Sequence, residues 1–121
     1  PSSFAERRKD AWDWTMLIPL PPAVTDADIR VGLDTAVRKK PELPIDRVAA
    51  RTIEEGLSLQ ILHVGSYDAE TLTLRRLHAE LMPAQDLTFN GPHHEVYLSD
   101  PRRVAPEKLR TILRQPVRAI D

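Results

Sequence analysis

The chain has 121 residues, the size of one compact domain, and it can bury a hydrophobic core without disulfides or bound metal to stabilise it. Its 17 Lys and Arg residues nearly balance 18 Asp and Glu residues, which argues against direct nucleic-acid binding. The absence of Cys excludes disulfides, thiolate metal sites and a Cys nucleophile. No apolar run approaches the ~20 residues of a membrane span and no signal peptide is visible, so a cytoplasmic protein is expected.

The first half of the chain predicts a strand followed by a helix. Residues 1–11 are polar and predict a loop or short helix. Trp14–Leu20 is apolar and stops at two prolines, which predicts a strand. Thr25 and Asp28 have the spacing of a helix N-terminal cap, and Pro41 closes the segment after three basic residues. Apolar residues recur between them at helical spacing, at Ile29, Leu33, Ala36 and Val37.

The middle of the chain predicts a hairpin and a second helix. Two predicted strands, Arg47–Ile53 and Leu57–Val64, flank a turn in which Gly56 is free to adopt positive φ. In the second segment, the period of two puts every other residue on one face, namely Leu57, Leu59, Ile61 and His63. A helical stripe follows at Leu74, Leu77, His78 and Leu81, and a loop is expected over Gln85–Pro92.

His93–Ser99 is the most informative predicted strand. Alternation places His93, Glu95, Tyr97 and Ser99 on one face, and His94, Val96 and Leu98 on the other. We expect Val96 and Leu98 to face the helices. A last strand, or a helix that leads into a strand, is expected over Lys108–Gln115, stopped by Pro116. The order of elements favours an α+β fold, an antiparallel sheet with helices packed on one face, within a single domain of residues 1–121.

Seven short motifs stand out along the chain, namely Trp14–Met16, Glu54–Gly56, Leu62–Gly65, Tyr67–Asp68, His93–Arg103, Ala105–Leu109 and Arg114–Val117. Through these motifs the chain resembles, from about Ser3 onward, the GyrI-like family of small-molecule-binding domains. Members of this family duplicate a β-α-β-β unit and bind ligands between the two halves. The chain is similar to the second half, so part of the first half is expected to be absent and the N-terminus truncated relative to the family.

The resemblance implies two kinds of function. The chain is particularly similar to a subgroup of hydrolases that open the cyclopropane ring of DNA-alkylating cyclopropanoid antibiotics, which would make it an antibiotic-resistance enzyme. Other members are non-catalytic effector-sensing domains of multidrug-responsive transcription regulators. No helix-turn-helix is visible in this sequence. The common expectation is a small-molecule ligand that is flat and either apolar or cationic.

Glu95 is the leading candidate for the site, since acids are depleted in mid-strand positions and the family's pocket acid matches it. It would act as a counter-charge or a general base, or simply face solvent, and it is not expected to be a buried structural partner. Tyr97 shares its face and would stack on a ligand or donate to a carbonyl oxygen. Tyr67, His93 and Trp14 complete the predicted ligand-binding set, with ordinary packing as the alternative for each.

No metal or other cofactor is expected. His93 and His94 are adjacent in a strand and point to opposite faces, so they cannot easily chelate one ion together. His63 and His78 are expected to form hydrogen bonds at the edge of the core. Because part of the duplicated fold is absent, we expect the chain to form a homodimer or to pair with a separate N-terminal half.

Overall fold

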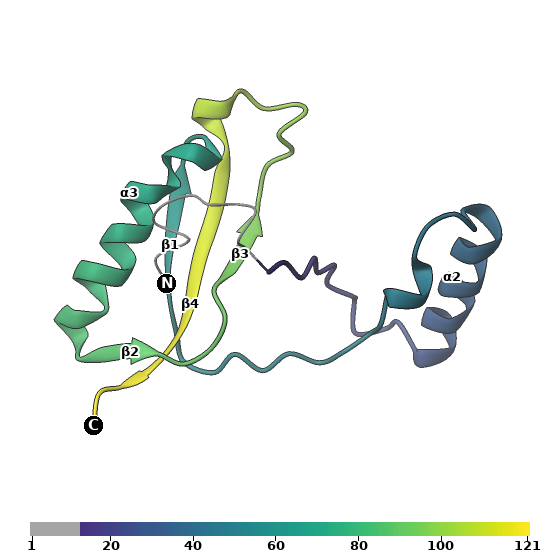
Figure 1. The fold of residues 1–121 in the computed structure, drawn as a ribbon, viewed down its shortest axis with the longest axis horizontal. Helices are drawn as coiled ribbons and strands as arrows, with labels where there is room; N and C mark the ends of the chain where they lie inside the picture. Colours follow the sequence, from purple (N-terminus) through teal and green to yellow (C-terminus); the bar gives the residue numbers. More distant parts are fainter. Residues whose placement is uncertain (1–12) are drawn as a thin grey trace. The chain divides into compact units, whose positions relative to one another are not determined.

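The computed structural model describes residues 13–121, which form two compact units (Figure 1). One unit contains Trp14–Ile53, and the other contains Asp13 and Glu54–Asp121 among the described residues. The loop or short helix expected over residues 1–11 lies outside the described residues.

The Trp14–Ile53 unit is built around one helix, α2 (Asp26–Lys39). The predicted cap is confirmed: the Thr25 hydroxyl accepts from the Asp28 N–H at 3.2 Å, and Asp28 accepts from the Thr25 N–H at 2.8 Å. The strands predicted over Trp14–Leu20 and Arg47–Ile53 are wrong, because neither segment pairs with a strand in this structure. Without a neighbouring strand an extended apolar run has no ladder to join, and Met16 and Ile18 are left 93% and 87% exposed.

The Glu54–Asp121 unit contains a four-stranded antiparallel sheet around one long strand. Strand β4 (Arg110–Ala119) is central, with β1 (Ser58–Val64) along one side (Figure 1). Its other side pairs first with β3 (His94–Tyr97) and then with β2 (Leu87–Phe89). The predicted α+β class with an antiparallel sheet is therefore confirmed.

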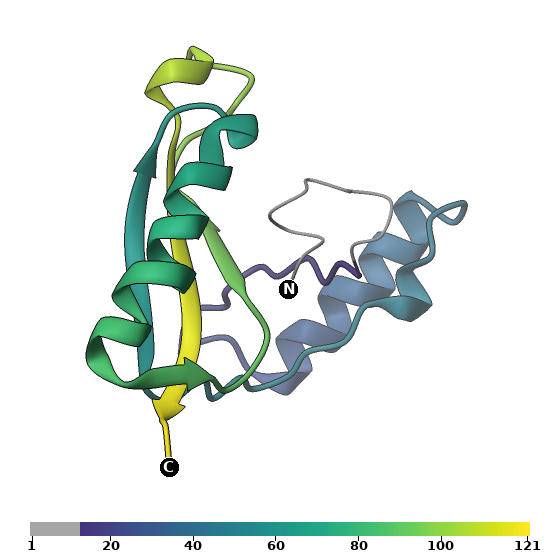
Figure 2. The same cartoon turned by 60° about the vertical axis from the view of Figure 1, so that its left-hand side comes forward.

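One helical segment covers one face of this sheet, as Figure 2 shows. It runs through α3 (Glu70–Arg75) and continues as π-helical turns over Arg76–Leu81. The predicted stripe is confirmed, since Leu74 and Leu77 are almost fully buried against Leu113 of β4. The partly buried side chains of Leu59, Ile61 and Leu81 pack around this cluster. Burying side chains of this size contributes about 1.5–3 kcal/mol each to folding.

Three local predictions about this sheet are wrong. The first strand pairs with the last strand instead of forming a hairpin, although Gly56 does adopt φ +66° as expected. The loop expected over Gln85–Pro92 contains β2. Pro116 does not stop the last strand. Along β4, pairing with β3 ends at Arg114 and pairing with β2 starts at Val117. The missing proline N–H therefore falls in the gap between the two partners, where it removes no ladder bond.

The two faces of the sheet differ from expectation in one respect that matters for function. His93, Glu95 and Tyr97 do share a face, as predicted, but it is the face that the helix covers. Val96 pairs with Ile112 on the opposite face, and Ile112 pairs in turn with Leu62, so the expectation that Val96 and Leu98 face the helices is wrong. Leu62, Val64 and Leu98 are 43%, 58% and 53% exposed there. We call the set Leu62, Val64, Val96, Leu98 and Ile112 the open face.

Among the described residues, 13–121, no helix is both long and apolar enough to cross a bilayer.

Candidate functional site

The candidate site lies between β3 and the helix. Glu95 pairs with Leu113, and Leu113 pairs in turn with Ile61, so these three side chains form one row on the helix-covered face. Leu113 and Ile61 fill the core beneath the helix. Glu95 stands at the end of that row, with only 13% of its side chain exposed. A carboxylate in such a place needs hydrogen bonds to offset its lost hydration.

Tyr97 supplies one of these hydrogen bonds. Its hydroxyl donates to Glu95 Oε2 at 2.8 Å, and its ring meets that of Tyr67 edge to face with centroids 5.5 Å apart. Tyr67 is held in the turn before α3, where the Ser66 hydroxyl accepts from the Ala69 N–H at 3.2 Å. Burial and the nearby charge of Glu95 raise the pKa of Tyr97, so its phenol remains a proton donor at neutral pH. Tyr97 is 51% exposed, which leaves this part of the site open to a ligand.

The environment of Glu95 favours its ionised form. Burial alone would raise the pKa, but hydrogen bonds from His93, Glu70 and Tyr97 outweigh it and lower the pKa to about 2. His93 Nε2 lies 3.4 Å from Glu95 Oε1, a longer contact than that of the tyrosine. Glu95 is therefore a structural partner as well as a candidate ligand residue, and the expectation that it is not a buried structural partner is wrong.

Glu70 is a member of this cluster that sequence analysis missed. It begins α3, is 1% exposed and shares a side-chain hydrogen bond with Glu95. A sequence signal was present: Glu70 lies four residues before Leu74, so it belongs to the apolar stripe that faces the sheet. An acid on such a stripe is unusual enough to mark a site.

A second aromatic group continues the cluster past His93. The rings of His78 and His93 have centroids 6.1 Å apart, and His78 meets Phe89 of β2 at 5.1 Å. Burial, followed by the charge of His93, lowers the pKa of His78 to about 4, so His78 is neutral at physiological pH. His78 lies beside other rings, whereas His63 forms hydrogen bonds to Thr73 at 2.8 Å and to the Ser66 carbonyl at 2.9 Å.

The structure brings together four of the five predicted site residues, namely Tyr67, His93, Glu95 and Tyr97. The fifth, Trp14, belongs to the other unit and is 57% exposed, so its role as a ligand residue stays a prediction. Within residues 13–121, no group of three or more His, Asp or Glu side chains has the arrangement of a metal site. The cluster can therefore offer an organic ligand a carboxylate, a phenol donor and several ring faces.

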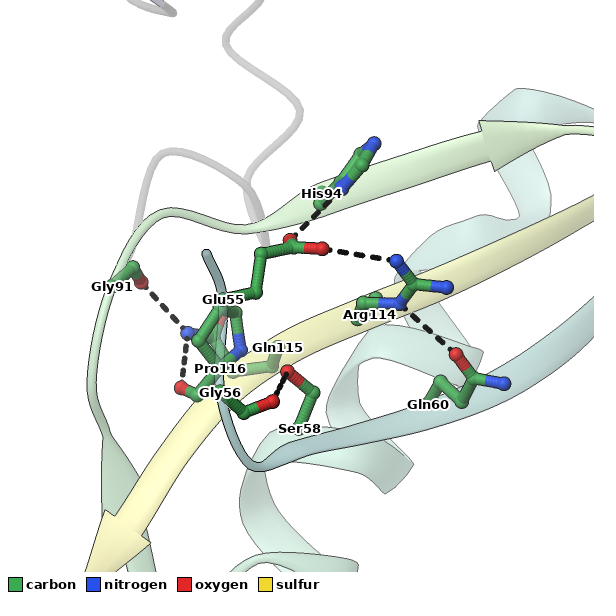
Figure 3. Close-up of polar contacts among 9 residues, drawn as sticks. All are labelled: Glu55, Gly56, Ser58, Gln60, Gly91, His94, Arg114, Gln115 and Pro116. Carbon is green, nitrogen blue, oxygen red and sulfur yellow. Dashed lines mark hydrogen bonds and ion pairs between the residues drawn. The ribbon is translucent and has the colours of Figure 1, made fainter. Parts of the chain in front are cut away.

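A separate polar network crosses the opposite face of the sheet (Figure 3). The Glu55 carboxylate accepts from Arg114 Nη1 at 3.0 Å and contacts His94 Nδ1 at 2.9 Å. Arg114 also donates to Gln60 on β1 at 3.0 Å. These contacts tie the segment before β1 to β3 and β4, since Glu55 is 59 residues from Arg114 in sequence. Burial would raise the pKa of Glu55, but its two cationic or hydrogen-bonding partners lower it overall.

Comparisons with known proteins identify the fold family. The model of the GyrI-like small molecule binding domain matches residues 22–118. A hydrolase from Listeria innocua is 35% identical, with a TM-score of 0.70, over 82% of this chain and 52% of that chain. An uncharacterized conserved protein from Listeria innocua is 37% identical, with a TM-score of 0.73, over 82% of this chain and 50% of that chain. The chain thus spans about half the length of these structures. No curated protein matches it.

Proposed function

Since the chain belongs to the GyrI-like small-molecule binding domain family, we propose that it binds flat apolar or cationic molecules at the Glu95–Tyr97 cluster. The observation that carries this proposal is the 2.8 Å hydrogen bond between Tyr97 and Glu95, beside the Tyr67 ring. It combines a negative charge, a proton donor and two aromatic surfaces in one place. Aromatic faces with a nearby carboxylate attract flat organic cations through stacking and Coulomb attraction.

The finer proposal is hydrolysis of cyclopropanoid antibiotics, in which a strained cyclopropane is conjugated to a dienone. Water would form a bond to a ring carbon while the cyclopropane C–C bond breaks. The electron pair of that bond moves through the dienone to its carbonyl oxygen. Glu95 takes a proton from the water, and Tyr97 donates a hydrogen bond to the oxygen as negative charge develops there. The oxygen finally gains a proton, so the overall change is the addition of one water molecule.

The hydrogen bonds of the resting site bear on this chemistry. A carboxylate whose pKa lies at about 2 is a weak base, and general bases work best with a pKa near the working pH. Tyr97 is one of the donors that hold the pKa of Glu95 down. If a ligand carbonyl takes over the Tyr97 hydroxyl, Glu95 loses a donor and its basicity rises. A bound substrate of this kind would therefore activate its own base.

The partner proposal is that a second copy, or a separate polypeptide carrying the other half, completes the fold. Two features support it besides the finding that the chain covers only about half of each Listeria chain. The open face of the sheet carries half-exposed apolar side chains, and so does the Trp14–Leu20 run in the other unit. Exposed apolar surface of this kind is typical of a contact surface.

Product analysis after incubation with a cyclopropanoid drug separates binding from catalysis. Molecules of ring-opened product in excess of protein molecules would support hydrolysis. If each protein chain sequesters one drug molecule and no ring-opened product forms, the result would support binding alone. Unaltered drug with no bound fraction would contradict both.

A further inference from the structure

The pairing of two acids at the centre of this cluster suggests a role for Glu70 that goes beyond ligand contact. Glu70 and Leu74 lie four residues apart on the helix, so they point to the same side, and Leu74 packs on Leu113. Glu95 lies directly opposite Leu113 in the sheet. The two glutamates therefore approach each other from opposite layers, next to the same leucine contact.

Hydrogen bonding between two carboxyl groups requires a proton. An ionised carboxylate only accepts hydrogen bonds, so a bond between Glu70 and Glu95 exists only when one of them is protonated. Both groups are poorly placed to carry a charge in water, since Glu70 is 1% exposed and only 13% of the Glu95 side chain is exposed, and this favours one shared proton. Like charges so close together disfavour the state in which both are ionised.

We infer that Glu70 and Glu95 hold one proton between them, and that a cationic ligand bound beside Tyr97 and Tyr67 displaces this proton into solvent. This inference rests on the proposed binding function and makes Glu70 a positioning residue, since it acts on the ligand through Glu95. A bound cation offsets the repulsion between two ionised carboxylates. In the unliganded protein the shared proton removes that repulsion. Binding and proton release are then linked, so affinity rises with pH.

Other titratable groups on several elements surround the two glutamates, and their charges influence the titration of the pair. Those that face it or lie in the adjoining rows of the same sheet face are Tyr67, Tyr97, His93, His78, His63 and Asp100. The tyrosines remain neutral across the relevant pH range because burial raises the pKa of both. The measurement must therefore separate the carboxyl groups from the histidines.

The pair itself is tested without any ligand. Carbon-13 labelling of glutamate side-chain carboxyl groups gives separate NMR titration curves for Glu70 and Glu95 in the wild-type protein. We expect each curve to show two steps, because each group senses the ionisation of the other. In Glu95→Gln protein the Glu70 curve should collapse to one step with a changed midpoint. Single-step curves in the wild type, with a Glu70 midpoint that Glu95→Gln does not move, would overturn the pair.

The linkage is tested with ethidium, a flat dye whose positive charge does not titrate near neutral pH. Calorimetry in two buffers with different ionisation enthalpies counts the protons released on binding. The wild type should release up to about one proton, and its affinity should rise by at most about tenfold per pH unit. Glu70→Gln keeps the size of the side chain and its ability to donate, so this variant should bind the dye without proton release.

The outcomes separate the inference from the function on which it rests. Equal proton release from the wild type and Glu70→Gln would overturn the linkage even though binding occurs. No binding of ethidium by the wild type would overturn the linkage together with the proposed cation binding, while the NMR titration still decides the carboxyl pair. Should Glu70→Gln fail to give a native amide spectrum, Glu70→Asp is used, and it should shift the two-step titration without abolishing it.

Discussion

Glu95 and Leu113 lie directly opposite each other on neighbouring strands, so an acid and one of the most buried leucines of the core share a row. This relationship places the carboxylate in the layer between sheet and helix, where water is largely excluded. Electrostatic interactions are stronger there than at an open surface. It also means that the site and the core are built from the same contacts, so substitutions at the site affect both stability and binding.

Tyr97→Phe should separate the hydroxyl from the ring. The phenylalanine keeps the edge-to-face contact with Tyr67, but Glu95 loses its 2.8 Å donor and its pKa should rise. We expect the free energy of unfolding to fall by about 0.5–1.5 kcal/mol, the net value of one hydrogen bond. Carboxyl titration by NMR and chemical denaturation measure the two effects. An unchanged Glu95 titration would show that the hydroxyl does not interact with it in solution.

Arg114→Met should destabilise the fold through the network on the opposite face. The methionine keeps much of the apolar stem, while Glu55 loses its charged donor at 3.0 Å in a half-buried setting. A loss of about 1–2 kcal/mol is expected. Arg102→Met is the matched control, because its pair with Asp100 leaves the arginine side chain 87% exposed and should contribute little to stability. Equal effects in the two variants would contradict a stabilising role for the Glu55 network.

Stability should decline with acid in two separate pH windows. His78 has its pKa lowered from 6.5 to about 4, so the unfolded chain takes up a proton first and stability falls between these values. Glu95 has its pKa lowered from 4.5 to about 2, so its contribution is complete above pH 4.5 and is lost as the pH falls toward 2. Urea unfolding at a series of pH values measures both windows.

Two variants assign these windows to their residues. His78→Gln should flatten the dependence between pH 6.5 and 4 and leave the lower window in place. Glu95→Gln should weaken the lower window, where Glu55 also contributes because its pKa is lowered. If His78→Gln left the upper window unchanged, the acid sensitivity would have to come from another histidine.

The sequence predicted the elements whose signals are local. The helix over Asp26–Lys39 follows from its capping box, and the strand over Ser58–Val64 follows from a clear alternation. The shared face of Glu95 and Tyr97 also follows from the period of two. Pairing between strands is a long-range property, so the sequence did not reveal that the last strand would lie between the first and third.

The same limit explains what was missed in the site. Which face the helix covers depends on tertiary packing, and the expectation for Val96 was reversed because the aliphatic side chains in and beside β3, Val96 and Leu98, lie on the face that the helix leaves open. Glu70 joins Glu95 from a distant segment, and no pattern around Glu70 alone names its partner. Glu55 was interpreted only as part of a turn, although its contact with Arg114 joins segments 59 residues apart.

The open face should drive association of the chain. Leu62→Lys and Leu98→Lys each place a charge on apolar surface that is about half exposed, which should weaken any contact made there. Light scattering across a concentration series should show wild-type chains associating and the double variant shifted toward monomer. Leu72→Lys is the control, because Leu72 is 72% exposed on the helix and lies outside the open face. A wild-type monomer at all concentrations would contradict the partner proposal.

The central claim, that Glu95 is the ligand carboxylate, is tested most directly by titrating wild-type and Glu95→Gln protein with ethidium and with a neutral flat dye. We predict that Glu95→Gln lowers ethidium affinity by at least about tenfold, or ~1.4 kcal/mol, and leaves neutral-dye affinity nearly unchanged. Because Glu95 also accepts hydrogen bonds in the core, a stability loss of about 1–3 kcal/mol should accompany this change. Glu80→Gln, at an exposed position on the helix, should alter neither. Equal ethidium affinity in the wild type and folded Glu95→Gln protein would contradict the claim.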